Sequence, residues 1–135
     1  MVVKQLSVFL ENKANSLNQM LQVLTDNGIN MSAFCVADSV DYGIVRFCVG
    51  RPELAYQILK DNNYTVRLTD VVCIEVPHES GGLHKAIRLI SQRGINIDYM
   101  YAFADGGSAK VVIRCDSNEA LIDILQENNI QMVKI

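Results

Sequence analysis

The sequence predicts an α+β protein built from two ferredoxin-like units, and three observations lead to that prediction. A shift of 66 positions places Gly28-Ile29-Asn30-Met31 on Gly94-Ile95-Asn96-Ile97 without a gap, which indicates two copies of one unit. Within each copy the apolar patterns follow the order βαββαβ, the split βαβ arrangement. Half of the 135 residues are hydrophobic, which is enough for a packed core.

The repeat divides the chain into a first domain over 1–69 and a second over 70–135. Units of this size are near the lower limit for independent folding, so we expect them to pack side by side. Each should have an antiparallel sheet with its helices on one face. The junction is not rich in Pro, Gly or Ser, and only Thr69-Asp70 is typical of a turn.

The first strand and the first helix of each copy follow from apolar spacing. Alternating apolar residues predict a strand over Lys4–Leu10, and 72–76 repeats the alternation. Spacing of i, i+3, i+4, i+7 predicts a helix from Leu17 to Leu24, repeated from Leu83 to Ile90.

The ends of these first helices also carry sequence signals. Ser16 with Gln19 fits a capping box at the start of the first helix. Gly28 and Gly94 suit the left-handed residue that commonly ends a helix.

The remaining elements follow in the same order in both copies. We expect second strands over 31–37 and 97–103, turns over 38–43 and 104–108, third strands over 44–49 and 110–115, and closing strands over 64–68 and 130–135. Third-strand residues expected to face the core are Val45, Phe47, Val49, Val111, Ile113 and Cys115. The second helix starts near Pro52, and its buried stripes are Ala55-Ile58-Leu59 and Leu121-Ile124-Leu125.

Composition excludes several classes of protein. A net charge of −3 disfavours nonspecific nucleic-acid binding, and no apolar run approaches the ~20 residues of a membrane span. The N-terminus has no signal-peptide pattern, so we expect a cytoplasmic protein. None of the four cysteines, Cys35, Cys48, Cys73 and Cys115, has C-x-x-C spacing, so we expect buried thiols without a metal or other cofactor.

Four functions compete on such a fold, because fold alone does not give function. A metal carrier would place cysteines in the first strand-helix loop, and the loop over 12–16 has none. An RNA-binding module would show aromatic and basic residues on its central strands, yet Phe9 is matched by Glu75. An enzyme would need a convergent set of reactive groups, and His78 and His84, the only histidines, lie in or next to one loop. The fourth function is a small-molecule sensor.

Two segments of the second copy resemble the pattern of the ACT domain. These are Pro77-His78-Glu79-Ser80-Gly81-Gly82-Leu83 and Gly94-Ile95-Asn96-Ile97, and copy one matches through Asn12-Lys13-Ala14-Asn15-Ser16-Leu17 and Gly28-Ile29-Asn30-Met31. The resemblance spans the chain as a tandem pair, similar to free-standing tandem ACT proteins that lack a catalytic domain. Asn15 replaces the Gly that the family prefers, and Ala14 and Ser80 replace its Pro. Asn15 can still adopt a left-handed conformation.

The resemblance implies a non-catalytic regulatory protein that binds a free amino acid at the interface between its two ACT domains. The expected ligand-binding residues are Asn12, Asn15, Ser16, Leu17, Asn30 and Met31 in copy one, and His78, Glu79, Gly81, Gly82, Leu83, Asn96 and Ile97 in copy two. Asn12 should act with Asn96, and His78 with Asn30, because the seam joins two copies. A helix N-terminus at the loop suits the carboxylate. Gly81 should let a ligand approach backbone N–H groups, so the site around its loop should be the tighter one.

Simpler structural roles compete with these assignments. Asn30 and Asn96 could only finish a helix-strand turn, where Asn is favoured. Asn12 and His78 could be ordinary loop residues. The aromatic stretch 99–103 is expected to pack in the core or seam, or to line a pocket for an apolar side chain, and the pairs Asn62-Asn63 and Asn128-Asn129 are expected to end the second helices.

The expected assembly is a homodimer stacked through the sheet face away from the helices, with a regulated enzyme of unspecified identity as partner. That face should carry Ser7, Phe9, Arg46, Cys48, Cys73, Glu75, Val112 and Arg114, a mixed set. The alternative function is a protein-protein interaction module that has kept the fold and lost the ligand, which the Ala14-Asn15 loop favours slightly.

Overall fold

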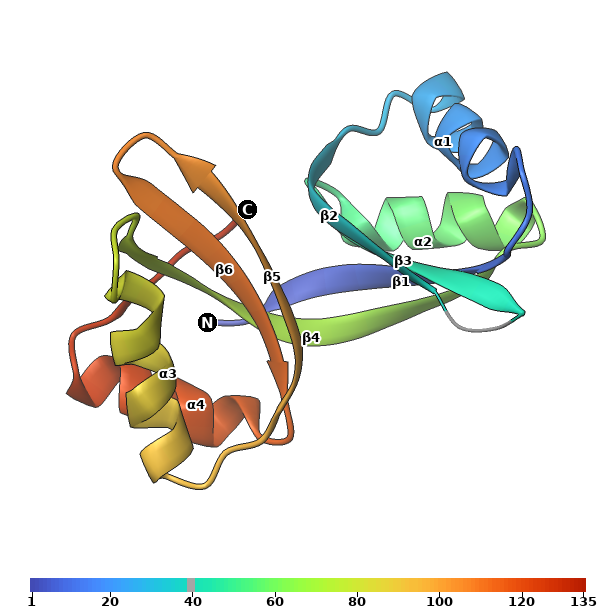
Figure 1. Ribbon diagram of the computed structural model, residues 1–135. Coiled ribbons are helices and arrows are strands. Elements are labelled where there is room, and N and C mark those ends of the chain that lie inside the picture. Colours follow the sequence, from blue (N-terminus) through green and yellow to red (C-terminus); the bar gives the residue numbers. More distant parts are fainter. Residues whose placement is uncertain (39–40) are drawn as a thin grey trace. The chain divides into compact units, whose positions relative to one another are not determined.

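The computed structural model describes residues 1–38 and 41–135, which form two compact units (Figure 1). The N-terminal unit comprises Lys4–Thr69 with Ile135, and the C-terminal unit comprises Met1–Val3 with Asp70–Lys134. Each unit has the predicted order of strands and helices.

The N-terminal unit places two helices on one face of an antiparallel sheet (Figure 1). Its elements are β1 (Val3–Glu11), α1 (Ser16–Asp26), β2 (Met31–Asp38), β3 (Tyr42–Val49), α2 (Pro52–Asp61) and the first part of β4 (Thr65–Pro77). β3 pairs with both β1 and β2, which leaves β2 at the sheet edge. The turn predicted over 38–43 includes Ser39 and Val40, which lie outside the described residues.

The C-terminal unit repeats this arrangement. After the second part of β4 come α3 (Gly82–Gln92), β5 (Ile97–Asp105), β6 (Ser108–Cys115), α4 (Asn118–Glu127) and β7 (Gln131–Met132). The strand order is β7-β4-β6-β5, and every pairing is antiparallel. The four helices of the described residues have 10 or 11 residues, and none is long and apolar enough to cross a membrane.

The turn predicted at Thr69-Asp70 is wrong, because both residues lie inside the 13-residue strand β4. The closing strand predicted over 64–68 and the following strand are therefore one element. The Asp70 carbonyl accepts a hydrogen bond of 3.0 Å from the Asn118 side-chain amide, so the backbone finds a partner without turning. The second closing strand is shorter than predicted, since only Gln131 and Met132 pair with β4.

The capping box predicted at Ser16 and Gln19 is also wrong. Asn15 is the N-cap residue, and Ser16 is already inside α1. Asn15 has φ of 76°, and among the described residues no side chain caps the helix by a hydrogen bond. Gly28 and Gly94 do have the predicted left-handed backbone, with φ of 68° and 72°.

Each unit has its own apolar core between its sheet and its helices. The predicted inward residues of β3 and β6 are all buried: Val45, Phe47, Val49, Val111, Ile113 and Cys115. Pro52 begins α2 as predicted. Within this helix Ala55 and Leu59 are buried, whereas Ile58 is half-buried. These cores fix where the loops that enter α1 and α3 lie.

Candidate ligand site at the helix-entry loops

The loops that enter α1 and α3 share a left-handed residue at the helix N-cap, although the residue differs. Asn15 has φ of 76° and Gly81 has φ of 85°, so Asn15 takes the left-handed conformation expected of it. Neither helix receives a side-chain cap from the described residues. The N–H groups of Ser16 and Gly82 donate to the carbonyls of Lys13 and Glu79, so the N–H groups of the next two residues of each helix are the ones available to an acceptor supplied by a ligand.

Two adjacent glycines have different roles in the C-terminal loop. A Cβ on Gly81 would meet nothing within 4 Å, which leaves open space beside that residue. A Cβ on Gly82 would lie 2.1 Å from the Pro77 carbonyl oxygen. Gly82 is therefore required by the tight loop itself, whereas Gly81 is favoured by its positive φ.

The polar residue that opens each loop is held by its backbone. The Asn12 N–H donates to the Asp41 carbonyl at 3.4 Å, and the His78 N–H donates to the Gly107 carbonyl at 3.0 Å. These bonds occupy equivalent positions in the repeat. The side chains of Asn12 and His78 are exposed, so they can reach a molecule bound at the loop.

Charge is arranged differently in the two loops. In the N-terminal loop the Lys13 ammonium lies 2.8 Å from the Glu11 carboxylate, and this hydrogen bond lowers the pKa of Glu11 below its usual value. Glu79 stands at the position of Lys13, and Pro77 stands at that of Glu11. The C-terminal loop therefore presents an acidic group where its counterpart presents a neutralised pair.

Asn30 and Asn96 lie at the far ends of α1 and α3 from these loops. Both are exposed. The Asn96 carbonyl accepts from the Asp116 N–H at 3.3 Å, and its side-chain amide donates to Asp98 at 3.2 Å. Asn96 thus has the structural role of finishing the helix-strand connection, and this role leaves its side-chain oxygen free of any described hydrogen bond.

A single unit does not bring the two predicted sets together. With 11 residues, α3 is about 16 Å long, and the loop and Asn96 lie at its opposite ends. A free amino acid is too short to contact both. Crosswise pairing between copies stays a prediction.

Three pockets lie against the loops, each within one unit. A pocket of about 300 Å³ is lined by His78, Glu79, Leu83 and Phe103, and Phe103 supplies an aromatic wall. A pocket of about 720 Å³ against the same loop is lined by Glu79, Gly81 and Gly82. A pocket of about 350 Å³ in the N-terminal unit is lined by Ser16. Predicted residues that line none of the three are Asn12, Asn15, Leu17, Asn30, Met31, Asn96 and Ile97.

Residues that the sequence analysis did not select also line the 720 Å³ pocket. They include Lys85 and Arg88 of α3, and Asn129 after α4. The predicted helix-ending role of the Asn pairs is compatible with this place, since the Asn128 side chain bonds the Ile124 carbonyl while Asn129 has φ of 55°. The sequence feature that could have identified Asn129 as a pocket residue is its identity with Asn63, which occupies the equivalent position 66 residues earlier.

Known proteins share both the family and the fold of this chain. The family model described as an ACT domain pair matches residues 1–135. A protein from Bacteroides thetaiotaomicron with a known crystal structure is 44% identical with a TM-score of 0.95, covering 98% of this chain and 92% of that one. Regulatory subunits of aspartate kinase share the fold: that of Thermus thermophilus is 14% identical with a TM-score of 0.69, and that of Thermus flavus 13% with 0.65, each comparison covering 92% of this chain and 90% of the other. A search of curated protein sequences found no match.

Proposed function

This chain belongs to the ACT-domain-pair family, and we propose that it is a non-catalytic regulatory protein that binds a free amino acid. One observation carries the proposal. The loops entering α1 and α3 share a left-handed N-cap residue, a helix start without a side-chain cap, and an exposed polar side chain. The geometry recurs although the residues at the N-cap differ.

The chemistry of an amino acid suits this geometry. Its carboxylate can accept from the N–H groups of the first helical turn, where the helix dipole favours negative charge. Its ammonium can donate to the side-chain oxygen of Asn12 or to a neutral His78 ring nitrogen. The open space beside Gly81 favours the C-terminal loop as the tighter of two sites.

The remaining contacts are proposed to come from another copy of the domain. Asn96 would act with the Asn12 loop, and Asn30 with the His78 loop, at the interface between the two ACT domains. The length of α3 supports this crosswise assignment, because Asn96 cannot reach the loop of its own unit. Ligand binding would then stabilise one arrangement of domains over others, which is how a ligand becomes a signal.

A second candidate is a protein-interaction module without a ligand. Phe34 and Val36 lie on the edge strand β2 and are 62% and 53% exposed. Exposed apolar residues at a sheet edge favour contact with another protein. The partner in that case would be a second copy of this chain, which forms a homodimer, or a regulated enzyme.

A thermal-shift screen of the twenty amino acids separates the two candidates. A ligand that binds only the folded chain stabilises it by about 2.7 kcal/mol at one hundred times its dissociation constant. We expect at least one amino acid to raise the melting temperature at millimolar concentration. No shift from any of them would leave the interaction module as the better candidate.

Two asparagine variants test the site. Asn96→Ala and Asn30→Ala should each weaken binding by roughly tenfold, the loss of about 1.4 kcal/mol from a hydrogen bond to a charged group. Asn62→Ala is the matched control, because this exposed asparagine lies outside all three pockets. Unchanged affinity in both site variants, measured by calorimetry, would show that the crosswise assignment is wrong.

A further inference from the structure

The 720 Å³ pocket of the C-terminal unit has a counterpart in the N-terminal unit. Adding 66 to each residue that lines the 350 Å³ pocket gives a residue that lines the 720 Å³ pocket. The matched pairs include Leu10 with Val76, Ser16 with Gly82, and Asn63 with Asn129. Because equivalent residues line a pocket in both copies, the pocket is a property of the folded unit.

The two pockets have diverged in charge. Glu75, Glu79 and Lys85 replace Phe9, Lys13 and Gln19 at equivalent positions. In the N-terminal pocket the positively charged lining residue is Lys13, and its ammonium is neutralised by the Glu11 carboxylate at 2.8 Å. The C-terminal pocket is lined by two carboxylates and two cations, Glu75, Glu79, Lys85 and Arg88, whereas the N-terminal pocket has only the paired Glu11 and Lys13, and both pockets have an apolar wall and an asparagine.

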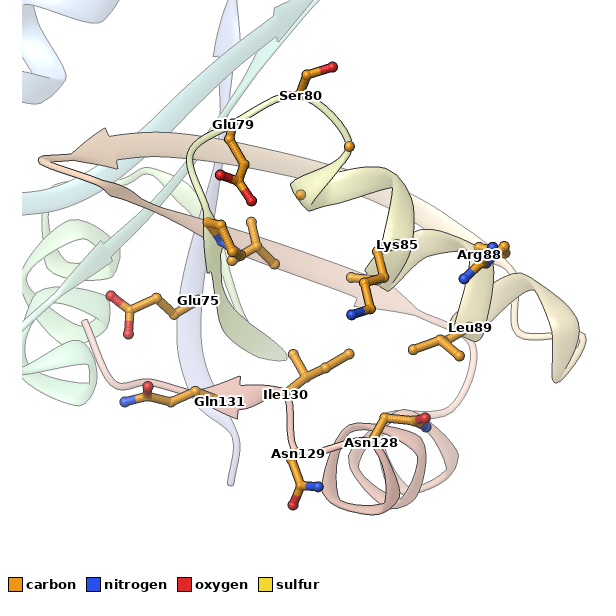
Figure 2. Close-up of a pocket in the computed structure, with 15 residues that line it drawn as sticks. Glu75, Glu79, Ser80, Lys85, Arg88, Leu89, Asn128, Asn129, Ile130 and Gln131 are labelled. Atoms are coloured by element: carbon orange, nitrogen blue, oxygen red, sulfur yellow. The ribbon is translucent and has the colours of Figure 1, made fainter.

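Three of the four charged side chains that line this pocket have no hydrogen-bond or ion-pair partner among the described residues. Within 1–38 and 41–135, the side chains of Glu79, Lys85 and Arg88 form no ion pair and no hydrogen bond, whereas Glu75 accepts from the Ser108 hydroxyl at 2.8 Å. Figure 2 shows Lys85 and Leu89 projecting from α3 toward Ile130, with Glu79 directed into the same space from the loop. A carboxylate and an ammonium thus face one pocket, and apolar side chains also line it.

We propose that this pocket is a second ligand site, contained within the C-terminal unit, for a small aliphatic amino acid. Glu79 binds the ammonium, Lys85 binds the carboxylate, and Leu89 and Ile130 contact the apolar side chain. The Asn129 amide offers a further donor and acceptor. A volume of about 720 Å³ falls within the range of small-molecule sites. The inference shares its ligand class with the proposed function, but it places the ligand away from Asn30 and Asn96.

Analogues that lack one charge test the two assigned contacts. The probes are L-leucine, N-acetyl-L-leucine, which has no ammonium, and L-leucinamide, which has no carboxylate. We expect the wild-type chain to bind each analogue at least about tenfold more weakly than leucine, as for loss of a charge-assisted hydrogen bond. Glu79→Gln should remove the preference for leucine over the acetylated analogue, and Lys85→Gln should remove the preference over leucinamide. Equal preferences in wild type and both variants would overturn the proposal.

Matched variants and a positional readout make this test independent of the interface site. Lys13→Gln and Gln19→Lys change the equivalent positions of the N-terminal pocket and should leave leucine affinity unchanged. In amide NMR spectra of the full chain, leucine should shift Lys85, Asn129 and Gln131, and Lys85→Gln should abolish these shifts. Shifts confined to residues near Asn30 and Asn96 would overturn the pocket and leave amino-acid sensing intact. No shift with leucine, valine or methionine at millimolar concentration would also overturn it, and the screen of all twenty amino acids would decide the proposed function separately.

Discussion

Single residues in the helix-entry loops show how one backbone is made by two sequences. Asn15 and Gly81 share a left-handed conformation, which Gly adopts freely and Asn adopts at some cost. The family resemblance was therefore sound at this position despite the substitution. What the sequence did not indicate is that a side chain at Gly82, the next residue, would clash with the Pro77 carbonyl.

Gly82→Ala should destabilise the chain by about 1–3 kcal/mol, the usual cost of forcing extra atoms into a packed site. Its Cβ would lie 2.1 Å from the Pro77 carbonyl oxygen, and a backbone atom cannot move aside cheaply. Urea unfolding measures the change. Gly50→Ala is the control, because a Cβ there meets nothing within 4 Å and no positive φ is involved. Equal stability of the two variants would show that the loop adapts.

Among the predicted site residues, exposure could be inferred and proximity could not. Asn12 and His78 were expected in loops because of their polar surroundings, and both are exposed. Glu79 was selected as a loop residue, but its place opposite Lys85 depends on how α3 leaves the loop. Such neighbours are set by the fold and have no spacing rule in the sequence.

At the scale of elements, helix bodies followed the apolar spacing and helix starts did not. The capping box at Ser16 failed because Asn15 takes the N-cap position with a left-handed backbone. A true side-chain cap occurs at α4, where the Ala120 N–H donates to the Ser117 hydroxyl at 3.2 Å. The two serines therefore differ in role although each stands near a helix start.

Ser117→Ala should lower the free energy of unfolding by about 1 kcal/mol, as expected for loss of an N-cap. Ser16→Ala should change it by less than about 0.5 kcal/mol, because Ser16 lies inside α1 and caps nothing. Chemical denaturation of both variants tests the difference. A larger effect at Ser16 than at Ser117 would restore the capping box.

β4 shows the opposite kind of error at the element scale. Thr69 and Asp70 have local turn character, yet the valines on either side, Val66, Val71 and Val72, are buried and favour a strand. Burial of these side chains and the bond from Asn118 to the Asp70 carbonyl outweigh the local preference. Local propensity therefore sets the end of a strand only where burial of the neighbouring side chains does not favour either conformation.

At the scale of the whole molecule, duplication produced two cores from one pattern. Leu24 and Ile90 occupy equivalent helix positions and are 2% and 0% exposed, each in the core of its own unit. Core positions have kept their apolar character between copies, while the pocket positions have changed charge. This contrast shows that the two units share a fold but differ in the charge of their equivalent pockets.

Leu24→Ala and Ile90→Ala should each destabilise the chain by about 2–5 kcal/mol through lost burial and the cavity left behind. Gln22→Ala is the control, since Gln22 is exposed on the same helix as Leu24, and it should change stability by less than about 0.5 kcal/mol. Thermal and urea unfolding measure both effects. A mild effect at either core position would contradict the separate core assigned to that unit.

By itself, the sequence determined the repeat and the order of elements. It also determined which third-strand residues face the core, such as Val45 and Val111, and the left-handed helix ends at Gly28 and Gly94. These features are local, because strand alternation, helical spacing and positive φ depend on neighbouring residues along the chain. Only the tertiary structure decided that β4 is continuous and that Lys85 shares a pocket with Asn129. Those two residues are brought together by packing α3 and α4 on one sheet, and no periodicity encodes contact between segments so far apart in sequence.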